Sequence, residues 1–206
     1  MQNSGNIMKP IITAAIAVIA SANAIFAAVP ALDELAGDWM QVDSLSSCPA
    51  VNNFSGGLQT TRNLAAFELL TLPPYGQRGW AVEFKLDGTP VKAIESRWYP
   101  FEVRRRATVN EVAMESAIRM PFEQNGVLTR ITLQNKSAQP RMLNLGLNAF
   151  GRVRIYPPEK WATWNTPRPN DGNFTASAAE GGKLLTIADQ TTPTVTAFAF
   201  VQPPMS

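Results

Sequence analysis

Residues 112–133 read VAMESAIRMPFEQNGVLTRITL, and their pattern decides the fold class. Glu111, Glu115 and Arg119 lie at odd positions, whereas the large apolar side chains lie at even positions. Such an alternation predicts a strand with one buried face and one solvated face. The turn-forming residues Gln124-Asn125-Gly126 follow, and a second alternating run then returns through Val127, Thr129, Ile131 and Leu133. The stretch therefore predicts a β-hairpin whose first strand buries Val112, Met114, Ile118, Met120 and Phe122.

Further strands are expected on both sides of this hairpin. One alternating run, with Trp80, Val82, Phe84 and Leu86 on its buried face, ends at Asp87-Gly88, a pair suited to a type I′ turn. Other strands are expected at about residues 91–98, 101–109, 143–149, 183–188 and 194–201, and one short helical turn within residues 30–36. The sequence therefore predicts an all-β fold, an antiparallel β-sandwich preceded by an N-terminal signal helix.

The composition excludes several classes of function. Among 206 residues, 18 are basic and 16 acidic, and a net charge of +2 is too small for the phosphate neutralisation that nucleic-acid binding requires. The sequence contains no histidine, which excludes imidazole-dependent triads and imidazole-ligated zinc. The single cysteine, Cys48, cannot form an intramolecular disulfide. We therefore expect no cofactor, no metal site and no nucleic-acid partner.

The N-terminal residues have the features of a secretory signal. Met8-Lys9-Pro10 gives a positively charged start, residues 11–22 are apolar, and Ala22-Asn23-Ala24 matches the small-x-small pattern of signal peptidase sites. We expect a signal peptide over residues 1–28, with Met8 as the initiator, and a sandwich domain over residues 30–206. Cleavage would make the protein periplasmic or extracellular. An uncleaved membrane anchor is the alternative, since the apolar character continues to Val29.

Residues 156–173 interrupt the strand pattern with several prolines and two tryptophans. Long irregular loops of this kind are commonly functional or contact another domain. Flat aromatic rings on a proline-stiffened loop can stack on sugar faces, and an arginine can donate hydrogen bonds to hydroxyl groups. The predicted carbohydrate or interdomain contacts are therefore Tyr156, Trp161, Trp164 and Arg168. The alternative is that these rings pack beneath the loop as a small satellite core.

No two neighbouring acids have the spacing of a glycosidase dyad. On one strand face Glu111 and Glu115 would lie about 13 Å apart, beyond the usual separation of catalytic carboxylates. We expect them to pair instead with Arg119 or Arg130 across the hairpin. In the run 104–106 of three arginines, alternation puts the central Arg105 on the opposite side from its neighbours, and we expect cross-strand pairing of the run with Glu102, Glu111 or Glu115. Phosphate binding by the cluster is the lesser alternative, and no catalytic residue is predicted.

Two segments together resemble a known family. VAMESAIRMPFEQNGVLTRITLQNKS, at residues 112–137, and LNLGLNAFGRVR, at residues 143–154, resemble the N-terminal β-sandwich, or super-sandwich, domain of secreted six-hairpin glycosidases related to family 63 glucosidases and trehalase-like enzymes. The resemblance extends loosely over residues 37–202 and consists mostly of strand pattern. It is carried by Arg119, Pro121, Phe122, Asn135, Leu143, Leu145, Leu147 and Gly151. In such enzymes both catalytic carboxylates lie on an (α/α)6 barrel that follows the sandwich, so no family catalytic residue is carried over to this chain.

Three functions are compatible with these features. We expect a non-catalytic accessory sandwich of a secreted carbohydrate-active protein, which packs against a catalytic (α/α)6 barrel and has no activity by itself. The first alternative is a stand-alone, lectin-like carbohydrate-binding module that uses the loop at 156–173. The second is a complete sandwich hydrolase or lyase, whose catalytic residues would have to come together from distant strands.

Overall fold

The computed structural model describes residues 31–77, 79–151, 153–155, 174–179, 181, 183–190 and 194–201. The chain divides into two compact units, Met1–Leu35 and Ala36–Ser206. In the first unit the described residues form one 3-10 turn, η1 (Leu32–Leu35), which confirms the helical turn expected within residues 30–36. The expected signal peptide, residues 1–28, lies outside the described residues. Among the described residues, no helix is long and apolar enough to cross a membrane.

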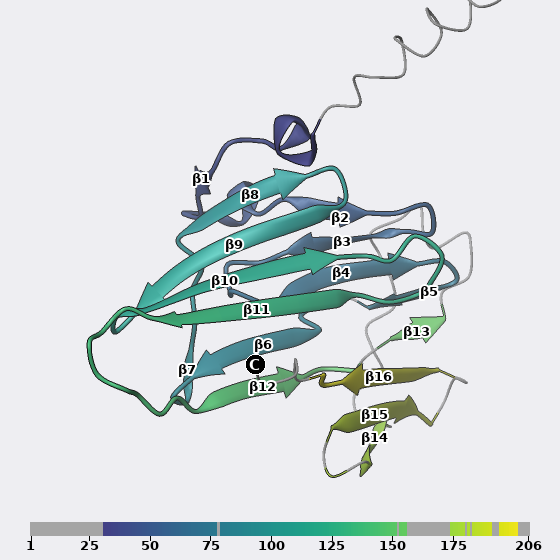
Figure 1. The fold of residues 1–206 in the computed structure, drawn as a ribbon. Helices are drawn as coiled ribbons and strands as arrows, with labels where there is room; N and C mark the ends of the chain where they lie inside the picture. The colour runs from purple at the N-terminus through teal and green to yellow at the C-terminus, as the bar shows by residue number, and fades with distance from the viewer. Residues whose placement is uncertain are drawn as a thin grey trace, which may run out of the picture. The chain divides into compact units, whose positions relative to one another are not determined.

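The second unit is all-β, and every strand pair described in it is antiparallel (Figure 1). Its first sheet has five strands, in the order β1 (Met40–Gln41), β8 (Glu95–Tyr99), β9 (Glu102–Val109), β10 (Val112–Arg119) and β11 (Leu128–Asn135). The predicted hairpin is β10–β11, with Val112 opposite Asn135 and Ile118 opposite Thr129. The predicted hairpin is therefore confirmed.

The predicted buried face of β10 is correct up to Met120 and wrong beyond it. Val112, Met114, Ile118 and Met120 are each at most 3% exposed, whereas the Phe122 side chain is 58% exposed. Strand β10 ends at Arg119, and Pro121 follows. Because proline has no N–H to donate to the ladder, the alternation does not continue to Phe122. Phe122 therefore lies in the loop at the end of the hairpin.

Two tight turns connect neighbouring strands, and one of them corrects the placement of Glu111. Asp87 and Gly88 have positive φ angles of 49° and 80°, as predicted for this turn. Asn110 and Glu111, with φ angles of 48° and 63°, form the corresponding turn between β9 and β10. Glu111 thus lies in a turn and not on a strand face beside Glu115.

The opposite layer consists of two sheets. The larger contains β13 (Arg154–Ile155), β5 (Tyr75–Gln77), β4 (Phe67–Leu72), β3 (Gly57–Thr60) and β2 (Ala50–Asn52), in that order. The smaller has the order β12 (Leu145–Ala149), β6 (Val82–Leu86) and β7 (Thr89–Pro90). Strand β6 begins at Val82, so Trp80, which the sequence placed on its buried face, is instead 41% exposed.

Two groups of buried side chains join the layers. One group brings Phe84 and Leu86 of β6 against Val112 and Met114 of β10. The other brings Val51 of β2 and residues of β3 and β4 against Val103 of β9 and Ile118 of β10. Burial of these apolar surfaces is the main stabilising contribution to this arrangement. The second unit therefore has the two facing layers of a sandwich.

A three-stranded sheet follows, with the order β14 (Phe174–Ala179), β15 (Leu184–Asp189) and β16 (Val195–Ala199). It confirms the predicted pairing of residues 183–188 with 194–201. Gly151, which follows β12, is buried, and a Cβ added there would lie 2.6 Å from the Ile187 side chain of β15. Only glycine permits this close approach. Thr194 also donates a hydrogen bond to the Val153 carbonyl, at 2.8 Å, which links β16 to the segment between β12 and β13.

Candidate functional site

The four residues predicted from sequence as carbohydrate or interdomain contacts lie outside the described residues. They are Tyr156, Trp161, Trp164 and Arg168. Their role as carbohydrate or interdomain contacts therefore stays a prediction.

The charged residues of the first sheet form surface pairs. Arg104 Nε donates to Glu102 Oε1 at 2.7 Å, and Arg106 Nε donates to Glu115 Oε2 at 2.9 Å. The predicted cross-strand pairing is confirmed for Arg106 of β9 with Glu115 of β10, whereas Arg104 pairs with Glu102 on its own strand, β9. The partner of Glu115 is Arg106 on β9, so the expected pairing of Glu115 across the β10–β11 hairpin, with Arg119 or Arg130, is wrong. The Arg106–Glu115 pair is partly exposed and contributes little stability, typically less than about 1 kcal/mol, whereas the carboxylate of the Arg104–Glu102 pair is buried.

The two outer arginines also lie over aromatic rings. The guanidinium carbon of Arg104 is 4.6 Å from the centre of the Tyr99 ring, and that of Arg106 is 3.7 Å from the centre of the Trp39 ring. Both distances are within the range of a cation–π contact. Since each of these two guanidinium groups already contacts a carboxylate and an aromatic ring, Arg104 and Arg106 have a structural role on the outer face of the sheet.

Arg105, the central arginine of the run, is completely buried. Its Nη1 donates to the carbonyl oxygens of Thr61, Asn63 and Ala66 at 2.8, 2.5 and 2.9 Å. These carbonyls belong to residues 61–66, the buried loop that joins β3 to β4. Within the described part of the chain, Arg105 Nε and Nη2 have no hydrogen-bond partner. Alternation predicted that Arg105 faces away from its neighbours, and the apolar Val103, Ala107 and Val109, which share its face, are the sign in the sequence that this face is the interior.

Burial lowers the pKa of Arg105 to about 9, against a smaller opposing effect of the Cys48 thiol. Burial likewise raises the pKa of Cys48, and this outweighs the opposite influence of Arg105. Because the thiolate is the reactive form of cysteine, a raised pKa makes Cys48 a poor nucleophile at neutral pH. The Cys48–Arg105 neighbourhood is therefore a buried structural centre and not a reactive one.

Among the described residues, no group of three His, Cys, Asp or Glu side chains could hold a metal ion. Glu111 lies in a turn, and Glu115 is bound to Arg106. Neither glutamate is therefore placed opposite another acid as glycosidase chemistry would require. The described residues that have the strongest features of a functional surface are aromatic rather than acidic.

Phe54 and Phe122 form an exposed aromatic pair at one end of the sandwich. Their side chains are 92% and 58% exposed, and their ring centres lie 6.0 Å apart with the planes tilted by 45°. Phe54 comes from the loop between β2 and β3, and Phe122 from the loop between β10 and β11, at the right of Figure 1. The pair thus joins the two facing layers at their loop ends.

The loops that carry the aromatic pair are tied to each other. Asn53 Nδ2 donates to the Pro121 carbonyl at 2.6 Å, while Asn53 Oδ1 accepts from the backbone N–H groups of Ser55 and Gly56 at 2.8 Å. Asn53 therefore holds the turn around Phe54 and also fixes the residue before Phe122. A surface preorganised in this way loses less conformational entropy when it binds a partner.

The aromatic pair was not predicted from the sequence, although one signal for it exists. Phe54 stands within Asn52-Asn53-Phe54-Ser55-Gly56, a stretch of turn-forming residues, where an aromatic side chain has no strand face on which to be buried. No protein-family model, curated protein or solved structure matches the chain.

Proposed function

We propose that this chain is the non-catalytic accessory sandwich of a secreted carbohydrate-active protein, with a super-sandwich-like fold that packs against a catalytic (α/α)6 barrel. The proposal includes export of the protein and cleavage of its signal peptide. It also includes the absence of catalytic residues from the chain itself. The proposal rests on the resemblance at residues 112–154 together with the placement of one of its residues, Phe122.

The observation that supports a docking role is the exposed aromatic pair. Aromatic residues are enriched in protein interfaces, and they are prominent among the residues whose truncation weakens binding most. Large exposed apolar groups have a cost in water, which an interface would remove. Phe122 belongs to the Arg119, Pro121, Phe122 part of the resemblance, and Phe54 from the other layer lies against it. We infer that the barrel contacts this end of the sandwich.

The first test concerns the partner itself. We expect a six-hairpin barrel to be encoded in the same or the adjoining reading frame of the source DNA, and the two purified polypeptides to form a one-to-one complex by analytical ultracentrifugation. The absence of any barrel sequence there, or a barrel that does not bind, would contradict the proposal.

The second test concerns the aromatic pair. The double variant Phe54→Ala/Phe122→Ala is expected to weaken barrel binding by at least about 30-fold, since truncation of interface aromatics commonly costs about 2 kcal/mol or more. Isothermal titration calorimetry measures the change. Leu45→Ala/Met142→Ala is the control, because both side chains are apolar and exposed but neither lies in the two loops that carry the pair. We expect it to bind within about twofold of wild type.

The same variants separate docking from direct glycan binding. If the wild type is retained on a polysaccharide affinity gel and the Phe54→Ala/Phe122→Ala variant is not, the aromatic pair binds carbohydrate and the docking role is wrong. Equal barrel binding by the aromatic variant and the control would also refute the proposed docking surface.

A further inference from the structure

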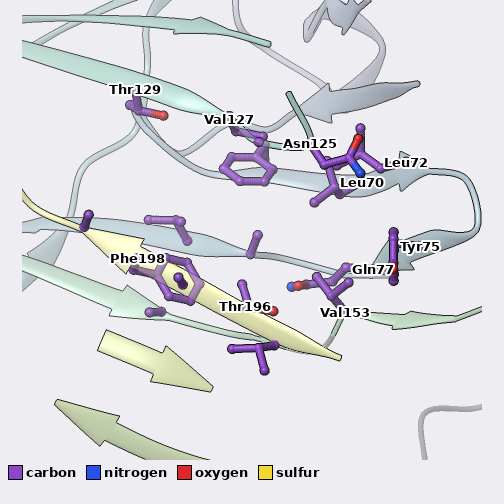
Figure 2. Close-up of a pocket in the computed structure, with 18 of the residues that line it drawn as sticks. Leu70, Leu72, Tyr75, Gln77, Asn125, Val127, Thr129, Val153, Thr196 and Phe198 are labelled. Atoms are coloured by element: carbon purple, nitrogen blue, oxygen red, sulfur yellow. The ribbon is translucent and has the colours of Figure 1, made fainter. Parts of the chain in front are cut away.

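A cavity of about 440 Å³ lies where β4, β5, β11, β12 and β16 approach one another (Figure 2). Leu70, Leu72 and Val127 line one side of it, and Thr196 and Phe198 of β16 line the other. Of the described residues that line it, Leu147, Val195 and Phe200 are 40%, 64% and 40% exposed, so the cavity opens to the surface on one side. At about 30 Å³ for each water-sized group, this volume would hold a ligand of about 10 to 15 non-hydrogen atoms.

The strand periodicity shows which side chains face the cavity. On β12, Leu147 and Ala149 line it, whereas Asn148 between them does not. On β11, Thr129 and Ile131 line it, together with Val127 just before the strand. Because side chains two apart share a sheet face, the cavity has Leu147 and Ala149 on one wall and Thr129 and Ile131 on another. Strand β16 contributes consecutive residues from Val195 to Ala199, so its backbone runs along the cavity.

The chemistry of the walls restricts the ligand. None of the described residues that line the cavity is charged, and most are aliphatic or aromatic. Some of the polar ones already bond to the protein: Gln77 Nε2 donates to the carbonyls of Trp80 and Phe150 at 2.9 and 2.5 Å, and Thr194 donates to that of Val153. The hydroxyls of Thr129 and Thr196 also face the space. A sugar would bury many hydroxyls here with few partners, at a high desolvation cost.

We propose that this cavity binds an uncharged, largely apolar small molecule, such as an alkyl chain or ring of about ten carbons with one hydroxyl or carbonyl group. The apolar part would contact Leu70, Leu72 and Phe198, and the polar group would hydrogen-bond to Thr129 or Thr196. An ionised head group is disfavoured because no described lining residue offers an opposite charge. The site is separate from the aromatic pair, and the inference does not depend on the proposed accessory function.

The test uses 1-aminonaphthalene, a dye that is uncharged at neutral pH, is small enough for the cavity, and fluoresces at shorter wavelength in apolar surroundings. We expect saturable binding to the purified full chain, and displacement by decanol at concentrations at least about tenfold lower than decanoate at neutral pH, since the carboxylate must lose its hydration. Ala149→Phe puts a ring into the cavity and is expected to weaken dye binding at least about tenfold. The matched control is Ala178→Phe, on an exposed position of β14 that does not line the cavity, and we expect dye binding within about twofold of wild type.

Several outcomes would overturn the inference. They are a wild type that gives no saturable binding, equal loss in the two phenylalanine variants, and equal displacement by decanol and decanoate. Dye binding that appears only in Trp161→Ala/Trp164→Ala would mean that the chain's own tryptophans fill the cavity, and would overturn it as well. Thermal unfolding followed by circular dichroism checks that Ala149→Phe is folded. If it is not, the comparison of decanol with decanoate on the wild type decides alone.

Discussion

Replacing Asn63 by alanine is expected to lower the free energy of unfolding by about 4 kcal/mol, the largest effect expected of a single substitution here. Asn63 is 3% exposed and lies in the buried loop between β3 and β4. Its Oδ1 accepts from the N–H groups of Ala65 and Ala66 at 3.2 Å and from that of Phe84 at 3.0 Å. Its Nδ2 donates to the Phe84 carbonyl at 2.9 Å.

The size of this effect follows from the backbone groups that alanine leaves without a partner. Three buried N–H groups lose their acceptor, and each unsatisfied buried group costs about 1–3 kcal/mol. The side-chain amide of Asn63 also bonds both backbone groups of Phe84, and thereby attaches the loop to β6. Urea denaturation of the purified full chain measures the change. Arg62→Ala is the control, because Arg62 is the exposed neighbour in the same loop, and we expect a change within about 0.5 kcal/mol. An equal loss in both variants would contradict the role given to the Asn63 amide.

The parts of the fold that sequence predicted correctly are those that depend on local pattern. The β10–β11 hairpin and the Asp87-Gly88 turn need only alternation and residues that accept positive φ. Strands β2 to β5, over residues 50–77, were not predicted. They are three to six residues long, their register shifts between Gly57 and Gln59, and Leu69 has a φ of 51°, so the period of two is interrupted.

The candidate sites depend on contacts that no local pattern encodes. The aromatic pair requires a loop of one layer to meet a loop of the other, and the apolar cavity requires β16 to lie across from β4 and β11. Likewise, alternation placed Arg105 opposite its neighbours but could not show that three carbonyls from residues 61–66 would surround it. Long-range placement of this kind depends on the packing of whole sheets, which the residues near each position do not determine.

The buried centre and the two candidate binding surfaces have different roles in the sandwich. Asn63 and Arg105 fix the loop at residues 61–66 between the layers, so they hold β3, β4 and β6 in one arrangement. Phe54 of the aromatic pair lies in the loop before β3, and β4 and β6 contribute Leu70, Leu72 and Val82 to the cavity. Loss of the buried centre should therefore affect both binding surfaces through stability, and not through their own contacts.

Replacing Arg105 by methionine is expected to lower the free energy of unfolding by about 3 kcal/mol, as for other buried polar networks that lose one partner. Two effects oppose each other. Methionine removes a desolvated cation whose Nε and Nη2 have no partner in the described part of the chain, which favours the variant. It also leaves the carbonyls of Thr61, Asn63 and Ala66 without their charged donor, and a hydrogen bond to a charged group contributes about 1.5–3 kcal/mol. We expect the stability lost at the three carbonyl acceptors to exceed the stability gained by removing the two unpartnered nitrogens, Nε and Nη2.

Arg105→Lys distinguishes this explanation from a simple effect of side-chain volume. All three acceptors lie around Nη1, which has only two N–H donors, whereas a lysine ammonium presents three donors from one nitrogen and has no counterpart of the unpartnered Nε and Nη2. We therefore expect Arg105→Lys to be more stable than Arg105→Met by at least about 1 kcal/mol in urea denaturation, although lysine fills less of the space. A methionine variant as stable as wild type, or more stable, would show that burying the charged guanidinium destabilises the fold by at least as much as its hydrogen bonds to the carbonyls stabilise it. In that case Arg105 would not be the residue that holds the loop between the layers.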